Sequence, residues 1–414
     1  MALTKINSQR PAVKTDALVI GGGLVGGMQA LALARCGLSV ALVDREDPAD
    51  WLDEGFDGRA SAVALASQRL LQALDVWPAL IAHACPILDI RVSEAEQPFF
   101  LHYDHRDVGS GPFGYMVENR FIRKAVYDAL RRTDGVHLFA PAPVAHIERT
   151  PGRAAAVLKN GTVLHAPVLI AADGRRSRIR TDAGIRVTQW AYGQTGIVCT
   201  VEHEKPHDNV AHEHFLPAGP FAILPLLHNR SSLVWVERDA VAPVIVALDE
   251  REFLHELEKR FGDFLGTLKV VGPRWSYPLS LQHAHRYTDN RLALIGDAAH
   301  GMHPIAGQGL NLGWRDVAAL TEVIHGAHRL GLDYGLETTL ETYERWRRFD
   351  TTLMLAMTDG LNRLFSNDIR PLKLARDLGL SLVNRLPPLK KVFMESAMGL
   401  AGDVPKLMRG EPLS

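Results

Sequence analysis

Residues 17–27 read ALVIGGGLVGG, and the interpretation of the whole chain starts from this stretch. Four apolar residues predict a buried strand, and a helix-compatible segment follows the glycines. Gly21, Gly23 and Gly26 fit the pattern G-x-G-x-x-G, whose glycines allow a tight turn, a close approach of the backbone to a pyrophosphate and close packing of helix on strand. The free N–H groups and partial positive charge at the start of that helix attract phosphates.

A second apolar run, residues 40–43, ends in Asp44. Asp44 follows Gly26 at about the 20-residue spacing expected for an acid that accepts hydrogen bonds from ribose hydroxyls. Strand, glycine turn, helix, strand and acid together predict a dinucleotide site, but they do not separate FAD from NAD. An ordinary glycine-rich turn in an α/β unit is the alternative.

The composition limits the classes of function. The 414 residues carry a net charge of −1, so no overall field favours nucleic acid or a strongly charged partner. Cys36, Cys85 and Cys199 are too scattered for a disulfide framework or a metal site, which suits a reducing compartment. No apolar run reaches the ~18 residues of a membrane-spanning helix. We expect a cytoplasmic protein, and peripheral contact with the inner face of a membrane stays open.

Residues 171–180 read AADGRRSRIR and follow a predicted buried strand. The strand would deliver Asp173, Gly174 and a cluster of arginines to one end of a sheet. Clustered guanidinium groups suit phosphate recognition. The alternative is the start of a helix whose basic side chains are simply solvated.

Residues 296–313 read GDAAHGMHPIAGQGLNLG and follow another predicted buried strand. The Asp297 carboxylate only accepts hydrogen bonds, which fits sugar or ribityl hydroxyls. Gly307 and Gly309 let backbone N–H groups face a flat ring, and the helix that begins there would stabilise negative charge on a reduced flavin. His300 and His303 are candidate proton carriers, with a structural role as the favoured alternative.

Two arginines and one strand residue are further cofactor candidates. Arg59 stands at a predicted loop-to-helix junction, where a guanidinium could reach a pyrophosphate or a ribityl chain. Arg120 opens a predicted helix over 121–131, and it either faces a ligand or pairs with an acid. Val144 belongs to a predicted strand over 143–147.

Strand patterns dominate between residues 190 and 237, which predicts an antiparallel sheet inserted into the α/β chain. Its segment GPFAILPL, residues 219–226, is apolar enough to wall a ligand pocket. The substrate-wall candidates are Phe221, Leu224, Pro225 and Trp235. Alternation puts Phe221 and Pro225 on one face and Leu224 on the other, and either face could meet the ligand.

The C-terminal part is predicted to be helical. One stripe is expected to face a core: Tyr343, Trp346, Phe349, Leu353, Met357, Leu361 and Leu364. From Arg370 onward eight Lys and Arg residues stand against four Asp and Glu residues, and one helical face is apolar: Leu389, Val392, Phe393, Ala397 and Leu400. This tail is expected either to lie on an anionic membrane or to form a helical cap.

Three motifs, GGGLVGG, AADGRRSRIR and GDAAHGMHPIAGQGLNLG, thus stand in order, together with GRASAVAL at 58–65 and YERWRRFD at 343–350. With them the chain resembles, over almost its whole length, the flavoprotein aromatic hydroxylases of the p-hydroxybenzoate hydroxylase fold, and most of all the ubiquinone-biosynthesis hydroxylases. The resemblance implies an α/β (α+β) fold: a Rossmann-like FAD-binding domain, an inserted antiparallel-sheet substrate domain and a C-terminal helical region. The expected boundaries are 1–84, 112–188 and 284–340 for the FAD-binding domain, 85–111 and 189–283 for the substrate domain, and 341–414 for the C-terminal region.

The resemblance also implies roles for the motif residues. Gly21, Gly23, Gly26 and Asp44 would hold the ADP part of a non-covalent FAD. Arg59 and Arg120 match family arginines near the cofactor, and the motif Asp173-Gly174 is associated with both FAD and a nicotinamide donor. Two groups would hold the ribityl chain and the flavin ring, namely Asp297 and the loop of Gly307, Gln308, Gly309, Leu310 and Asn311. NAD(P)H or another reductant would bind transiently, because the chain has no second dinucleotide fingerprint.

The implied activity is the monooxygenation of an aromatic ring. Reduced flavin would react with O2 to give a C4a-hydroperoxide, which delivers OH to an electron-rich ring in a site that excludes water. No side chain is singled out as a catalytic base, and no metal is expected. The expected substrate is a polyprenylated phenol or quinol of ubiquinone biosynthesis, and other proteins of that pathway are candidate partners.

Two other functions stay open. A hydroxylase of a small soluble phenol would have a small closed pocket with an anchor for a carboxylate. A flavin-containing scaffold of a biosynthetic complex would show no reductant-driven turnover. The basic apolar tail and the apolar segment 219–226 favour the polyprenylated substrate.

Overall fold

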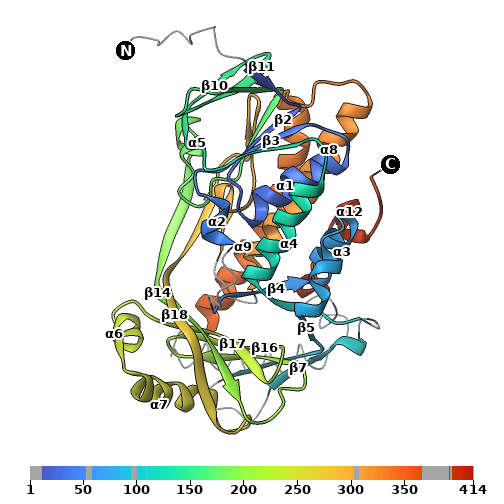
Figure 1. Cartoon of the computed structure of the whole chain (residues 1–414). Coiled ribbons are helices and arrows are strands. Elements are labelled where there is room, and N and C mark those ends of the chain that lie inside the picture. The colour runs from blue at the N-terminus through green and yellow to red at the C-terminus, as the bar shows by residue number, and fades with distance from the viewer. Residues whose placement is uncertain are drawn as a thin grey trace.

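The computed structural model describes residues 12–52, 58–94, 100–107, 109, 111–302, 307–365, 391 and 394–413. One part of the molecule is built on a parallel sheet and the other on a large mixed sheet, and two long strands run between them (Figure 1). Among the described residues, none of the helices has both the length and the apolar character needed to cross a membrane.

A six-stranded sheet with the order β19-β20-β13-β2-β3-β9 forms the centre of the first part. Its strands are β2 (Ala17–Ile20), β3 (Val40–Val43), β9 (Val136–Phe139), β13 (Val168–Ala171), β19 (Thr288–Asp289) and β20 (Leu292–Leu294). All neighbours are parallel except β19, which pairs antiparallel with β20. Strands β2, β3, β13 and β20 are buried throughout, which explains their unbroken apolar runs.

Helices and a second sheet enclose this parallel sheet. The helices that pack against it or one another are α1 (Leu24–Arg35), α4 (Asn119–Arg132) and α8 (Gly309–Arg329). The second sheet contains β1 (Ala12–Lys14), β10 (Val144–Thr150), β11 (Arg153–Leu158) and β12 (Val163–Ala166). All of these elements contribute to one apolar core, so they form a single Rossmann-like layer structure.

A small three-stranded sheet lies between the two parts of the molecule. It consists of β4 (Ala60–Ala64), β5 (Ala84–Ile87) and β8 (Gly114–Glu118), in the order β4-β8-β5. Helix α3 (Leu65–Ala73) follows β4 directly, and the short α2 (Pro48–Trp51) precedes it. Arg59 therefore stands before a strand, which corrects the predicted loop-to-helix junction.

The large sheet has the order β21-β18-β14-β17-β16-β15-β6-β7. Its strands are β6 (Asp89–Glu94), β7 (Phe100–Asp104), β14 (Val187–His203), β15 (Val210–Leu216), β16 (Gly219–Leu226), β17 (Arg230–Arg238), β18 (Leu268–Ala284) and β21 (His300–Gly301). All pairs are antiparallel except β15 with β6. The predicted inserted antiparallel sheet is thereby confirmed. Helices α6 (Ala242–Ala247) and α7 (Glu250–Phe261) lie beside it (Figure 1).

Helix α9 (Glu337–Phe365) buries a different face from the predicted one. Tyr343 is buried as expected, but Phe349 is 74% and Leu353 is 53% exposed. The buried positions are one turn apart, at Tyr343, Arg347, Thr351 and Leu355. The predicted core stripe is therefore wrong at Phe349 and Leu353; the side chains of Leu361 and Leu364 lie outside the described ones.

Only part of the predicted C-terminal face lies within the described residues. Ala397 and Leu400 are described, while Leu389, Val392 and Phe393 lie outside. Met394 and Met398 are buried against residues of β5, β8, β15 and β16. Helix α12 (Lys406–Arg409) then packs on α3, so this end of the chain is part of the folded molecule.

Candidate functional site

The glycines of the first turn meet distinct steric requirements. Gly21 has a φ of +106°, and a Cβ there would overlap the carbonyl oxygen of Ala172. A Cβ on Gly26 would overlap the carbonyl oxygen of Gly21, whereas Gly23 has open space within 4 Å. Helix α1 begins without a side-chain cap and without an acid in its first turn. Its N–H groups are thus left for an anionic ligand.

Asp44 lies beside this turn. Its carboxylate accepts hydrogen bonds from the N–H of Gly22 and, at 2.8 Å, from the N–H of Glu46. The N–H of Ala142 donates to the Asp44 carbonyl at 2.6 Å, and Val144 begins β10 two residues later. The structure therefore brings together Asp44 and the glycine turn, and Val144 follows two residues after the contact of Ala142 with Asp44.

A second uncapped helix start lies close to the first. Helix α8 begins at Gly309 without a side-chain cap. The indole Nε1 of Trp314 donates to the carbonyl of Leu24 at 3.0 Å, and a Cβ on Gly313 would come within 2.8 Å of Val25 Cγ2. Close packing of α8 on α1 thus brings together two helix N-termini, both of which favour negative charge.

Two acids near the ends of parallel strands keep acceptor atoms that have no partner among the described residues. The Asp297 side chain is exposed and accepts no hydrogen bond from the described residues. Asp173 uses Oδ2 to accept from the N–H groups of Arg178 and Ile179, at 3.0 and 3.3 Å. Its Oδ1 is buried without a partner. These acceptors fit the hydroxyls of FAD, and the two helix starts fit its phosphates and the negative charge of the reduced ring.

The loop before α8 is tied to β4. The Asn311 amide accepts from the N–H of Ala64 at 3.0 Å and donates to the carbonyl of Ala62 at 2.9 Å. Gly307 has a φ of +61°, and a Cβ there would lie 3.2 Å from the Cβ of Ala62. The side chain of Asn311 therefore positions β4, and the backbone of the loop is the part left for a ring. His303 lies outside the described residues.

Gln308 and Leu310 also have defined surroundings. The Gln308 amide donates to the carbonyl of Ala397 at 3.4 Å, which links this loop to the C-terminal segment. Leu310 packs against the core of the Rossmann-like part. Both side chains are thus held by protein contacts beside Gly307 and Gly309.

The arginines of the second motif do not converge. Arg175 donates to the carbonyl of Ser280, and the buried Arg180 donates to the carbonyl of Ala298 at 2.8 Å. Arg178 pairs with Asp182 at 3.4 Å. This corrects the predicted phosphate cluster, because Arg175 and Arg180 join separate elements of the fold and Arg178 pairs within its own helix.

The two remaining arginine candidates for cofactor binding, Arg59 and Arg120, contact different partners. The guanidinium of Arg59 lies over the ring of Trp275, 5.0 Å from its centroid. Arg120 Nε donates to the buried Glu118 at 2.8 Å, and Glu118 also accepts from Arg230 at 2.8 Å. Arg120 therefore follows the alternative of pairing with an acid, whereas Arg59 lies against an aromatic ring of the large sheet.

The two faces of the large sheet meet different neighbours. Phe221 and Trp235 lie in an apolar cluster with residues of α7, and Pro225 shares their face by alternation. Leu224 lies on the other face, in a cluster with residues of β4, β5 and β8. The structure corrects the expectation for Phe221, Pro225 and Trp235, which serve the core under α7, and leaves Leu224 facing the site.

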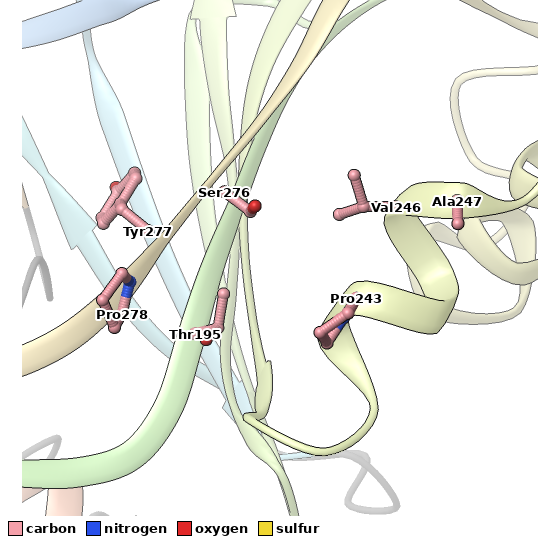
Figure 2. A pocket seen from close by; sticks show the side chains of 7 residues that line it. All are labelled: Thr195, Pro243, Val246, Ala247, Ser276, Tyr277 and Pro278. Carbon is pink, nitrogen blue, oxygen red and sulfur yellow. The ribbon is translucent and has the colours of Figure 1, made fainter.

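A hollow on the α7 side can be set apart from the site. It has a volume of about 340 Å³ and lies between α6 and the ribbon of β14 and β18 (Figure 2). Ser276 points toward α6 there, while Tyr277 points to the opposite side of the ribbon (Figure 2). This hollow therefore opens on the face away from Arg59.

On the face toward Arg59 one row of side chains crosses the sheet. Direct cross-strand pairing aligns Trp275, Val198, Val234, Ala222 and Glu213 in that order. We call this row the sheet floor. A hydrogen bond of 3.4 Å from Thr200, on the same face of β14, to the carbonyl of Gly58 joins this face to the loop that carries Arg59.

The sequence did not predict the sheet floor as a site. The alternation pattern could have shown which residues of each strand share a face. Which of the two faces meets the loop at Gly58 follows only from contacts between strands distant in sequence. Four members are apolar or aromatic, and Glu213 is the one ionisable member of the row.

A buried charge network lies behind the second helix start. Asp316 is fully buried and binds His300 Nε2 at 2.6 Å and Arg347 Nε at 2.8 Å. Burial by itself would raise the pKa of Asp316, but His300 and Arg347 outweigh it and hold the pKa below its usual value. Asp316 also accepts from the N–H of Gly296, the residue before Asp297. His300 thus has the structural role, and it holds the turn that presents Asp297.

Comparisons with known proteins agree with this geometry. Residues 14–355 match the family described as FAD binding domain. Ubiquinone hydroxylase UbiL of Rhodospirillum rubrum is 54% identical over 401 residues, 96% of this chain and 93% of that protein. The 3-demethoxyubiquinol 3-hydroxylase of Escherichia coli is 35% identical over 388 residues, 93% of this chain and 99% of that protein.

A solved structure extends the comparison to the fold. The p-nitrophenol 4-monooxygenase PnpA from Pseudomonas putida DLL-E4 matches with a TM-score of 0.78 at 18% identity, over 94% of this chain and 99% of that one. The likeness covers both the parallel and the mixed sheet, so the two proteins share their whole architecture. The chain therefore belongs to the family of FAD-dependent monooxygenases that includes the ubiquinone-biosynthesis hydroxylases.

Proposed function

We propose that this FAD-dependent monooxygenase hydroxylates the ring of a polyprenylated phenol or quinol intermediate in ubiquinone biosynthesis. The observation that carries the proposal is the 54% identity to a ubiquinone hydroxylase along nearly the whole of both chains. FAD supplies the reactive oxygen when it is reduced and O2 binds, with NAD(P)H or another reductant as the electron source.

In this proposal the turn at Gly21, Gly23 and Gly26, with Asp44 and Val144, and the loop of Gly307–Asn311 would hold FAD. Asp297 and the Asp173 oxygen that lacks a partner among the described residues would accept hydrogen bonds from its hydroxyls. Arg59 lies where the sheet floor begins, so it would stand between the cofactor and the substrate. The chain would divide near the predicted boundaries: the shared sheet of β6, β7 and β14–β18 supports a substrate domain, although β5 and β21 pair across those boundaries.

The sheet floor supports the choice of substrate. Trp275, Val198, Val234 and Ala222 offer an apolar surface on which a prenylated ring can lie, and each buried methylene of the tail contributes roughly 0.8 kcal/mol. Glu213 would repel the carboxylate of a hydroxybenzoate, so the row offers no anchor for a small acidic phenol. Leu224 extends the apolar surface in the next row.

The test is a comparison of substrates on the purified, FAD-loaded enzyme. We expect hydroxylation of a short-chain prenylated phenol, detected by mass spectrometry, with NADH, NADPH and reduced ferredoxin tried in turn as donors. 4-Hydroxybenzoate without a prenyl chain should react at least tenfold more slowly. Preference for the unprenylated acid would support the soluble-phenol function, and no turnover with any donor would support a scaffold.

The proposal also covers the location of the enzyme and its partners. The basic tail after Arg370 would bring the enzyme to an anionic membrane surface, where prenylated intermediates partition, or to other proteins of ubiquinone biosynthesis. Co-sedimentation with vesicles separates these two partners, because only membrane contact depends on anionic lipid.

A further inference from the structure

We propose that Glu213 accepts the proton of the substrate's ring hydroxyl and is the base of the hydroxylation. This inference rests on the proposed function, because it requires a phenolic or quinolic substrate above the sheet floor. It assigns a chemical role to a side chain that has no hydrogen-bond or ion-pair partner among the described residues.

The position of Glu213 follows from strand register. On β15, Glu213 pairs with Ala222 of β16, and Ala222 pairs with Val234 of β17. Paired residues point to the same face, so Glu213 shares the face of Leu224 and not the face covered by α7. Its neighbours in β15, His212 and His214, point to the α7 side, where His212 lies 4.9 Å from Phe264 in ring-centroid distance.

The carboxyl group is partly buried and has no partner among the described residues. Glu213 makes no hydrogen bond and no ion pair with the described residues, whereas His214 on the opposite face binds Ser93 at 2.5 Å. A carboxyl group removed from water normally finds a donor. The hydroxyl of a ring lying on the sheet floor is a donor of the right kind at this place.

Glu213 differs in its pKa from two neighbouring titratable groups on the same face of the sheet. Burial raises the pKa of Glu213 to about 7. Tyr103 of β7 and Cys85 of β5 face the same side, and burial raises the pKa of both, that of Cys85 to about 11. Among the described residues, the charged groups toward that side are Arg59, which lies over Trp275 at the other end of the row, and Glu118 with the arginines bound to it, Arg120 and Arg230, which already form ion pairs.

The transfer of the phenol proton to Glu213 needs no oxidant or reductant. The O–H bond of the phenol breaks, its electron pair stays on the ring oxygen, and the proton forms an O–H bond on a Glu213 carboxylate oxygen. The ring becomes more electron-rich and therefore more reactive toward an electrophilic oxygen. The carboxyl group afterwards loses the proton to solvent. A base with a pKa near the working pH is the efficient choice for this transfer.

The experiment compares the wild-type holoenzyme with Glu213→Gln and Glu213→Asp on a prenylated phenol between pH 5.5 and 9. We expect the wild-type kcat/KM to fall below an apparent pKa near 7. Glu213→Gln should keep its FAD, lose about 100-fold in kcat and lose this acidic limb. Glu213→Asp should keep the limb with a smaller loss. Glu258→Gln, on the exposed side of α7, is the matched control with unchanged kinetics.

A ring-fluorinated phenol separates a base from a merely structural residue. Such a substrate is already ionised near neutral pH. The activity of Glu213→Gln should therefore be at least tenfold higher on this phenol than on the unfluorinated one. The proposal is overturned if Glu213→Gln keeps wild-type kinetics and pH dependence, or if it retains FAD but is not rescued by the acidic phenol. If Glu213→Gln does not fold, loss of the acidic limb in Glu213→Asp overturns it as well.

The outcomes distinguish an error in the proposed substrate from an error in the role of Glu213. If the wild type hydroxylates only an unprenylated phenol, the proposed substrate is wrong, and the Glu213 series is run on that phenol with the same expected outcomes. If the prenylated phenol reacts but the Glu213 variants behave like Glu258→Gln, the proposed function stands and the role of Glu213 does not.

Discussion

Three carboxylates have oxygen atoms that accept no hydrogen bond from the described residues, and we propose that ligands bind there. Asp297, Asp173 and Glu213 each keep oxygen atoms that the described residues do not satisfy. Leaving such groups without partners has a cost of about 1–3 kcal/mol each when water is excluded. Elsewhere the buried acids each have two side-chain partners: Asp316 binds Arg347 and His300, and Glu118 binds Arg120 and Arg230. The contrast supports the proposal that the first three carboxylates face ligands.

Asp297→Ala should lose FAD, because it removes an acceptor for ribityl hydroxyls that the site takes out of water. We expect the ratio of flavin absorbance to protein after desalting to drop at least tenfold relative to the wild type. Asp182→Ala, on the exposed side of α5 (Arg178–Asp182), should retain the wild-type ratio. Full retention of FAD by Asp297→Ala would refute the role assigned to this carboxylate.

Glu213 should also make stability depend on pH. Its folded-state pKa, about 7, lies above the usual value of 4.5, so the folded protein holds the proton more tightly. Stability is therefore greatest below about pH 4.5 and declines as pH rises through 7. Glu213→Gln should be more stable than the wild type at pH 8, by about 1–3 kcal/mol after allowing for partial exposure, and equally stable at pH 5.

Thermal denaturation of wild type, Glu213→Gln and Glu258→Gln at the two pH values measures this effect. A rise in Tm at pH 8 that vanishes at pH 5 is the expected signature. An equal Tm for Glu213→Gln and wild type at both pH values would mean that Glu213 ionises as an exposed carboxyl group does.

At the scale of elements, helices α8 and α9 are joined by buried charges as well as by apolar contacts. Arg347 of α9 is fully buried and binds Asp316 of α8, and it also binds Asp350 at 3.1 Å. Asp350 in turn binds Arg315 at 3.0 Å. Burial lowers the pKa of Arg315 to about 10, so this cation stays charged at neutral pH.

Asp316→Ala should destabilise the protein strongly, because Arg347 would remain buried without its main counter-charge. Breaking one partner of a buried ion pair costs about 3–5 kcal/mol. The same substitution removes the acceptor for the N–H of Gly296 and should weaken FAD binding as well. Arg345→Ala, on the exposed face of α9, should change the free energy of unfolding by less than about 0.5 kcal/mol. Equal Tm values for the two variants would exclude a structural role for the network.

For the molecule as a whole, the end of the chain closes against the site. Met394 and Met398 pack with Leu224 and Leu226 on the face of the large sheet that looks toward β4 and β5. Gln308 donates to the carbonyl of Ala397, so the same segment touches the loop before α8. A tail that binds a membrane would therefore bring the apolar side of the substrate site close to that membrane.

Reversing two charges of the tail, in Lys390→Glu with Lys391→Glu, should weaken binding to anionic vesicles more than tenfold. Each basic residue near an anionic surface contributes about 1 kcal/mol, and Lys391 is exposed, with only a long 3.8 Å pairing to Glu395. Lys259→Glu on α7 is the control. Vesicle co-sedimentation that responds neither to this double substitution nor to lipid charge would remove membrane contact from the proposed function.

What the sequence by itself determined is local. The turn at Gly21–Gly26, the acid at Asp44 and the strands that precede Asp173 and Asp297 are each encoded within about 30 residues. Their residue types leave few alternatives: a Cβ at Gly26 cannot fit, and an unbroken apolar run is stable only as a buried strand. The dinucleotide site therefore followed from the residues themselves, and FAD followed from the family resemblance that the motifs carry.

Only the tertiary structure decided which faces meet. Alternation groups Phe221 with Pro225 and Leu224 with Ala222, but the choice between α7 and the loop at Gly58 depends on contacts between distant segments. Arg347 is buried because Asp316, 31 positions earlier, neutralises it, and this pairing exposes Phe349 against the apolar pattern. Periodicity fixes which residues share a face, whereas packing energy between elements selects the face that is buried.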